Sequence, residues 1–158
     1  MSSFYVIAHN IRSLFNVGSI FRTADAFKVT KIFLTGYTGT PLNPIHERKI
    51  AKVALGAEKW VPWEYQKSVS KLIKNLQEQK VKVIALENGV KAKNLRQFKT
   101  KASVALLLGE EVKGINKGLL KLCDEVVEIP MHGKKESLNV SVAFGIAAYE
   151  IGSNIPPL

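Results

Sequence analysis

Three polar segments that contain glycine carry the residues whose types and spacing could support chemistry. The first, residues 10–26, contains Asn16, Gly18 and Arg22. Asn16 and Gly18 predict a turn that leads into a helix, where unpaired backbone N–H groups favour an anion. Arg22 lies off the apolar stripe of that helix, and its guanidinium could donate paired hydrogen bonds to a phosphate. Taken alone, the segment favours a simpler interpretation, in which Asn16 caps the helix and Arg22 is a surface residue.

The second segment, residues 107–116, continues from an apolar stretch that predicts a buried strand. It contains Gly109 and Glu111, and it ends at Asn116. Ligands bind at the carboxyl ends of the strands in open α/β sheets, and a glycine lets the backbone approach a ligand closely. A plain loop that ends at a capping Asn116 explains the same residues equally well.

The third segment, residues 129–143, begins where a predicted strand meets a proline and continues through a polar loop. Ser137 or Asn139 can cap the helix that follows. Because a capped helix end still offers backbone donors, this cap is compatible with a bound ligand. The segment is therefore a candidate binding loop as well as the start of a helix.

Short apolar stretches and helical periodicity predict the framework that positions these segments. The predicted strands lie at residues 4–8, 31–35, 81–86, 102–108 and 125–129. Two helical stripes lie between them, one formed by Val17, Ile20, Phe21 and Ala24 and the other by Val69, Leu72, Ile73 and Leu76. Alternating strands and helices predict an α/β fold with a mainly parallel sheet that is flanked by helices.

The last predicted helix follows Asn139 and reaches Ile151, and its apolar residues surround the helix axis. A helix that is apolar on all sides must be buried on several sides. A chain of 158 residues offers few neighbours that could cover a terminal helix so completely. We therefore expect a second copy of the chain to cover part of this helix.

Net charge indicates the class of partner. The chain has 23 lysine and arginine residues against 13 acidic residues, which gives a net charge of +10 and an isoelectric point near 9.7. Such a field attracts polyanions, and nucleic acids are the commonest polyanions inside cells. Lys67, Lys71 and Lys74 lie off the apolar stripe of their helix, and we interpret them as a solvated face rather than as a dedicated binding groove.

Length and composition exclude several classes of protein. A length of 158 residues fits one domain, residues 1–158. No apolar stretch is long enough to span a membrane, and the N-terminus lacks the basic region of a signal peptide. The single Cys123 excludes an intramolecular disulfide and a cysteine-based zinc cluster, which favours the reducing cytoplasm. The three histidines, His9, His46 and His132, are too scattered to predict a metal site.

Taken together, the three segments resemble the motifs of the SPOUT superfamily of RNA methyltransferases, and specifically its TrmH (SpoU) group. The sequences that carry the resemblance are NVGSIFRT at residues 16–23, GEEVKG at residues 109–114 and IPMHGKKESLNVSVA at residues 129–143. The resemblance extends from about residue 6 to residue 151. It leaves no room for the additional RNA-binding domain of some relatives, so we expect a minimal catalytic domain.

The resemblance implies a fold, a cofactor and an assembly. The fold would be a Rossmann-like sheet whose C-terminal segment forms a deep trefoil knot, which general rules of chain topology disfavour. The chain would act as a homodimer with its sites near the interface. S-adenosylmethionine would bind in the knot, largely through the backbone, at Leu86, Gly109, Ile129, Met131, Ser137 and Leu138.

The same resemblance implies methylation of an RNA ribose 2′-hydroxyl, and the reaction needs no metal. Arg22 would activate or position that hydroxyl with Asn16 nearby, Glu111 and Asn139 would organise the pocket, and Ser137 would contact the target phosphate. Arginine is a poor base because its pKa exceeds 12, so we favour a positioning role for Arg22. We expect tRNA as substrate in preference to rRNA.

Two other functions remain open for this sequence. The first is an RNA-binding homologue that no longer methylates, although Asn16, Arg22, Glu111 and Asn139 are all present. The second is a nucleotide-dependent oxidoreductase with a Rossmann fold. That class requires the pattern G-x-G-x-x-G after the first strand, and residues 10–18 do not supply it.

Overall fold

The computed structural model describes residues 2–89 and 91–155, which fold around one sheet. Within these residues the sheet has seven strands in the order β3-β2-β1-β6-β4-β7-β5, and every neighbouring pair is parallel. The predicted α/β fold with a mainly parallel sheet is therefore confirmed. The strands are β1 (Phe4–His9), β2 (Lys31–Thr35), β3 (Trp63–Gln66), β4 (Lys82–Leu86), β5 (Lys93–Asn94), β6 (Val104–Leu108) and β7 (Glu125–Glu128).

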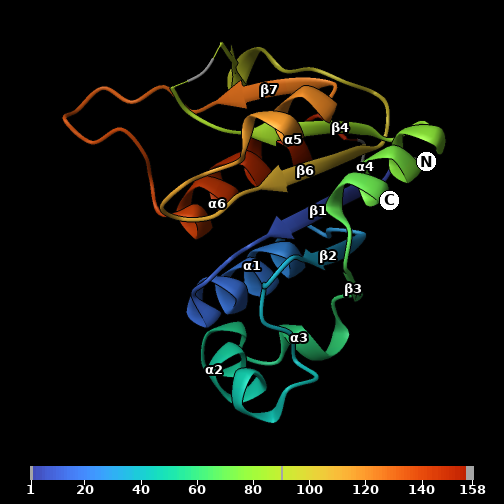
Figure 1. The fold of residues 1–158 in the computed structure, drawn as a ribbon, viewed down its shortest axis with the longest axis vertical. Coiled ribbons are helices and arrows are strands. Elements are labelled where there is room, and N and C mark those ends of the chain that lie inside the picture. Colours follow the sequence, from blue (N-terminus) through green and yellow to red (C-terminus); the bar gives the residue numbers. More distant parts are fainter. Residues whose placement is uncertain (1, 90, 156–158) are drawn as a thin grey trace.

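Helices cover both faces of the sheet (Figure 1). One apolar cluster joins the sheet to α1 and α6, and a second joins its opposite face to α4 and α5. No helix in the described ranges is long and apolar enough to cross a membrane. The helices are α1 (Leu14–Ala26), α2 (Pro44–Ala54), α3 (Ala57–Trp60), α4 (Val69–Glu78), α5 (Lys117–Leu122) and α6 (Val140–Gly152), with a short 3-10 helix at Leu95–Gln97.

The predicted strands are all present, and the two strands that were not predicted lie at the edges of the sheet. β2 has the predicted bounds, and β1, β4, β6 and β7 differ from theirs by one or two residues. β3 consists of alternating aromatic and polar residues that are only partly buried, and β5 has two residues. Neither edge strand carries the continuous apolar stretch that identifies a buried parallel strand.

The start of α1 differs from the prediction. Asn16 and Gly18 lie inside the helix rather than in a turn before it, because Ser13 is the N-cap and its Oγ accepts a hydrogen bond from the Asn16 N–H at 3.2 Å. Gly18 instead lets α2 pack closely, since a Cβ at this position would lie 2.5 Å from the carbonyl oxygen of Ile50. The glycine of the first segment is therefore required by helix packing.

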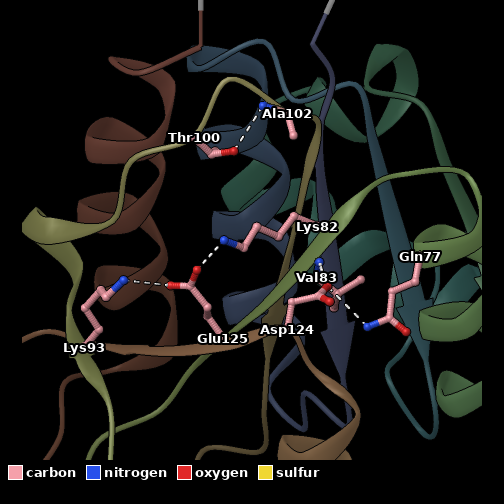
Figure 2. Close-up of polar contacts among 8 residues, drawn as sticks. All are labelled: Gln77, Lys82, Val83, Lys93, Thr100, Ala102, Asp124 and Glu125. Carbon is pink, nitrogen blue, oxygen red and sulfur yellow. Dashed lines mark hydrogen bonds and ion pairs between the residues drawn. The ribbon is translucent and has the colours of Figure 1, made fainter.

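Polar contacts fix β7 beside β4 (Figure 2). The carboxylate of Glu125 pairs with Lys82, and it accepts a longer contact from the Lys93 ammonium at 3.4 Å. The neighbouring Asp124 accepts a hydrogen bond from the backbone N–H of Val83 at 2.7 Å. These contacts set the register of the two strands, so the loops that follow them open at the same edge of the sheet.

Glu111 joins the loop after β6 to the loop after β1. One of its oxygens accepts a hydrogen bond from the Arg12 N–H, and the other accepts from the Ser13 N–H and from the Asn16 side-chain amide, each at 3.1 Å. Partial burial by itself would raise the pKa of Glu111, but the hydrogen bonds from Arg12, Asn16 and Ser13 outweigh it and lower the pKa below its usual value. The ionised form of Glu111 therefore stabilises the fold.

Replacing Glu111 by glutamine should make the protein less stable at neutral pH by about 1 to 2 kcal/mol, because hydrogen bonds to a charged acceptor are lost. Since the folded pKa lies below the unfolded one, this stabilisation is present above the unfolded pKa and is lost as pH falls through the folded pKa. The urea unfolding curves of Glu111→Gln and the native chain should therefore be separated at neutral pH and converge at acidic pH, as the pH falls through the folded pKa. Glu78→Gln, at an exposed position on α4, is the matched control and should change the free energy of unfolding little. An equal gap at both pH values would contradict this role.

Candidate active site

A cavity of about 940 Å³ lies at the carboxyl ends of β4, β6 and β7. Its walls are the loops that follow these strands, at residues 86–89, 108–114, 128–131 and 133–140, together with Ala143 of α6. Parallel strands direct all three loops toward the same edge, and the loop between β7 and α6 projects from the body of the protein (Figure 1). The cavity is therefore where an open parallel sheet binds ligands.

All six residues predicted to bind a cofactor line this cavity. They come from three loops that are distant in the sequence, and the lining combines apolar side chains with glycine backbone. Such a surface can hold a flat ring between apolar groups while backbone N–H and C=O groups recognise its polar edge. The six residues are Leu86, Gly109, Ile129, Met131, Ser137 and Leu138.

Glycine is required at position 109 because the loop after β6 packs closely there, and because a ligand must be able to enter the cavity. A Cβ at this position would lie 2.5 Å from a side-chain carbon of Ile115 and 2.9 Å from the carbonyl carbon of Gly114. Gly114 itself has φ of +67°, and its missing side chain leaves room for the Glu87 carboxylate. That carboxylate accepts a hydrogen bond from the Ile115 N–H at 2.7 Å. These contacts hold the loop after β6 against the end of β4.

Glu87 and Asn88 are cavity residues that the sequence analysis missed. The Asn88 amide donates to the carbonyl oxygens of Ile129 at 3.0 Å and Glu136 at 3.4 Å, and so joins the end of β4 to the loop after β7. Both residues directly follow a strand that was correctly predicted. Their position at the carboxyl end of that strand was the signal that could have identified them.

Asn16, Glu111 and Asn139 form a hydrogen-bonded chain beside the cavity. The Asn16 amide donates to Glu111 at 3.1 Å, and its carbonyl oxygen accepts from the Asn139 amide at 3.3 Å. Asn139 also caps α6, because its Oδ1 accepts from the Ser141 N–H at 2.9 Å. Three residues that are distant in the sequence are thus brought together, and each polar side chain is oriented by another.

Arg22 lies apart from this group. It is six residues beyond Asn16 on α1, its side chain is exposed, and it does not line the cavity. It forms no side-chain hydrogen bond or ion pair with any residue in the described ranges. Ser137 does line the cavity, on an exposed part of the loop before α6. Of the five predicted catalytic residues, Glu111, Ser137 and Asn139 therefore line the cavity, Asn16 is hydrogen-bonded to two of them, and Arg22 lies outside this group.

The lining of the cavity is more acidic than the protein as a whole. Its five carboxylates exceed its three lysines in a chain whose net charge is +10. Carboxylates accept hydrogen bonds from hydroxyl and amino groups and favour a positively charged ligand. Within the described residues, no group of three or more histidine, cysteine or acidic side chains could hold a metal ion. The acidic lining residues are Glu87, Glu110, Glu111, Glu128 and Glu136, and the lysines are Lys113, Lys134 and Lys135.

Solved structures share this fold. An AdoMet-bound rRNA methyltransferase from Sinorhizobium meliloti is 27% identical with a TM-score of 0.84, and the match covers 94% of this chain and 55% of that one. A structure described in terms of 2-OH methylation of C/U34 on tRNA is 26% identical with a TM-score of 0.82. That match covers 94% of this chain and 93% of the other, so the two have nearly the same extent.

Sequence comparison identifies the family. The 23S rRNA (guanosine-2′-O-)-methyltransferase RlmB of Vibrio vulnificus (strain CMCP6) is 30% identical over 149 residues, which is 94% of this chain. The match covers 58% of that relative, so the chain spans little more than half the length of the curated relatives it resembles. The SpoU rRNA Methylase family matches residues 3–149, and the chain therefore belongs to this family.

Proposed function

We propose that the protein is an S-adenosylmethionine-dependent RNA 2′-O-ribose methyltransferase whose cofactor binds in the cavity at the ends of β4, β6 and β7. The observation that carries this proposal is the convergence of all six expected cofactor residues on one cavity, beside the chain of Asn16, Glu111 and Asn139. Family membership and a similar structure described as AdoMet-bound support it.

The residues of the cavity fit this cofactor chemically. When bound, S-adenosylmethionine supplies a methyl group on a positively charged sulfonium, which is a good electrophile. The surplus of carboxylates in the lining suits a cationic ligand. Leu86, Ile129 and Leu138 offer apolar surface for an adenine ring, and the glycine backbone at Gly109 and Gly114 lets the ligand approach the main chain.

The protein's own side chains would align the ribose hydroxyl and hold the RNA. Asn16 and Asn139 carry amide groups that can bind the hydroxyl, and Glu111 fixes the orientation of Asn16. Ser137 lies on the exposed part of the cavity loop, where it can bind the target phosphate. Arg22 would bind the RNA backbone from outside the cavity, and its planar guanidinium suits a phosphate. This assignment makes Arg22 a positioning group rather than a base.

We infer that tRNA is the substrate in preference to rRNA. A similar structure whose description concerns 2-OH methylation of C/U34 on tRNA, with a TM-score of 0.82, supports this preference, whereas the RlmB relatives are named for 23S rRNA. We also propose that the chain acts as one catalytic domain and that its C-terminal segment forms a trefoil knot. A cytoplasmic location agrees with the single Cys123, which cannot form an intramolecular disulfide.

We propose that the protein is a homodimer that associates through α6. Phe144, Ala147 and Ala148 of this helix are buried within the chain, whereas Val142 and Tyr149 are at least half exposed. Ile146 lies between these two along the helix and is 43% exposed. One face of α6 therefore presents apolar side chains to solvent, and a second copy would remove that surface from water.

The cofactor assignment predicts that the protein binds S-adenosylmethionine and does not bind NAD, which isothermal titration calorimetry measures directly. Gly109→Ala should weaken S-adenosylmethionine binding at least ~10-fold, because its Cβ displaces the segment at Ile115 that closes the cavity. Gly152→Ala at the end of α6 is the control, since the nearest atom would lie 3.9 Å from its Cβ and the residue does not line the cavity. Tight binding of NAD without binding of S-adenosylmethionine would refute the assignment.

The role of Arg22 predicts that Arg22→Ala folds normally and keeps its affinity for S-adenosylmethionine. Single-turnover methyl transfer to RNA should nevertheless fall at least ~100-fold, because a bound RNA that is slightly misplaced no longer aligns its ribose hydroxyl with the methyl donor. Arg22→Lys should restore little, because an ammonium lacks the planar pair of donors. Arg48→Ala, an exposed arginine on α2, serves as control. Normal transfer by Arg22→Ala would show that this residue has no part in the reaction.

The proposed dimer predicts that Ile146→Glu dissociates the protein, because a charged side chain would be buried in the apolar interface. Sedimentation velocity at micromolar concentration should give a dimer for the native chain and a monomer for the variant. Leu42→Glu is the control, since Leu42 is 78% exposed in the loop before α2. A native chain that sediments as a stable monomer would rule the dimer out.

A further inference from the structure

Tyr37 presents its ring to solvent at the edge of the sheet where the cavity opens. It lies in the loop that follows β2, and β2 runs parallel to β1. The loops after both strands therefore lie at the same edge as the cavity. Its side chain is 54% exposed. Single exposed aromatic residues are common in proteins, so the exposure alone assigns no role to Tyr37.

The backbone that carries this ring has an uncommon conformation. Gly36 has φ of +63°, and Asn10, which lies against it, has φ of +54°. The side-chain oxygen of Asn10 accepts a hydrogen bond from the Tyr37 N–H at 3.1 Å. A Cβ on Gly36 would lie 1.8 Å from that oxygen, so the turn requires glycine at this position. Conformations of this kind persist where the surrounding structure holds them in place.

Two further side chains hold the same turn. The Tyr65 hydroxyl donates to the carbonyl oxygen of Gly36 at 3.0 Å. The buried Thr38 hydroxyl accepts from the Ile11 N–H at 3.0 Å and donates to the carbonyl oxygen of Ala8 at 2.9 Å. These bonds attach the loop after β2 to the end of β1. Hydrogen bonds within the turn therefore fix the position of the exposed ring, although the ring itself takes no part in them.

Charged groups of the loops after β1 and β6 influence the phenol. Desolvation and the carboxylate of Glu110 raise the pKa of Tyr37 above its usual value, whereas Arg12 acts in the opposite direction. Glu110 lines the cavity, and the Arg12 N–H binds Glu111. Tyr37 does not itself line the cavity, but its N–H binds Asn10 in the loop after β1, the loop whose Arg12 N–H binds the cavity residue Glu111. The phenol stays neutral at physiological pH. The exposed side chain of Arg12 adds a positive charge nearby.

We propose that Tyr37 is the stacking platform for an RNA base at the mouth of the cavity. This inference rests on the proposed function and describes how the same site holds its substrate. A rigidly held aromatic face beside a cation suits a nucleotide, because the ring stacks on the base and the cation binds the phosphate. Stacking is also tolerant of base identity, so Tyr37 would position the nucleotide while other contacts select it.

The test compares Tyr37→Ala with Tyr37→Phe in the full chain, with unmodified tRNA transcripts as substrate. Tyr37→Ala should lower kcat/KM for the RNA about 10-fold, mainly through KM, which is within the range for the loss of one stacked base. Tyr37→Phe keeps the aromatic face and should stay within about 2-fold of the native chain. Affinity for S-adenosylmethionine should not change in either variant. Trp60→Ala on α3 is the control, because Trp60 is similarly exposed at 60%.

Photo-crosslinking tests the contact without relying on activity. A tRNA transcript that contains 5-iodouridine should crosslink under ultraviolet light to the peptide that contains Tyr37, which mass spectrometry identifies. The crosslink should survive in Trp60→Ala and disappear in Tyr37→Ala. Crosslinks confined to other peptides would overturn the proposal.

The outcomes separate this inference from the function on which it rests. A native chain that neither binds nor methylates RNA would overturn both. A native chain that methylates RNA, together with a Tyr37→Ala variant of unchanged kcat/KM, would overturn the stacking role alone. Equal losses in Tyr37→Ala and Tyr37→Phe, with unchanged melting temperatures, would also overturn it, because the lost group would then be the hydroxyl rather than the ring.

Discussion

The carboxylate of Glu111 holds together two loops that are almost one hundred residues apart in the sequence. It accepts two backbone N–H groups at the start of α1 and the amide of Asn16, so it fixes both the entry to that helix and the orientation of a polar side chain at the site. Asn139 then connects to Asn16 and at the same time begins α6. The orientation of the polar side chains beside the cavity therefore depends on a few oxygen atoms, which accept hydrogen bonds from both main-chain and side-chain groups.

The protein separates its charges by location. Its surface carries a large positive excess, which suits a polyanion, whereas the cavity contains more carboxylates than lysines. The acidic groups of the cavity also serve the fold, since Glu87 and Glu111 accept hydrogen bonds from the loops that surround them. A small cationic ligand and a large anionic one can thus be accommodated at adjacent places without competing for the same side chains.

The framework could be predicted from the sequence because buried parallel strands are continuously apolar, and the loops after those strands contained the residues of the cavity. The role of Gly18 was misassigned, because only the three-dimensional structure reveals that α2 packs against it. Asn88 was missed because its partners, the carbonyl groups of Ile129 and Glu136, are more than forty residues away. The turn beneath Tyr37 depends on a similar pairing of distant residues, which no local pattern indicates.

The order of the strands has a consequence for how the chain is made. β1 pairs on one side with β2 and on the other with β6, and β6 also separates β1 from β4. During synthesis, the first hundred residues therefore leave the ribosome with one edge of β1 unpaired, and such an edge can associate with other chains. Pairing this edge of β1 with β6 requires contacts between residues far apart in sequence, and such contacts form slowly. The loops that Glu111 connects meet only when β6 has docked, and the cavity is complete only after β7 and the loop that follows it have joined the sheet, so a nascent chain acquires its binding site late.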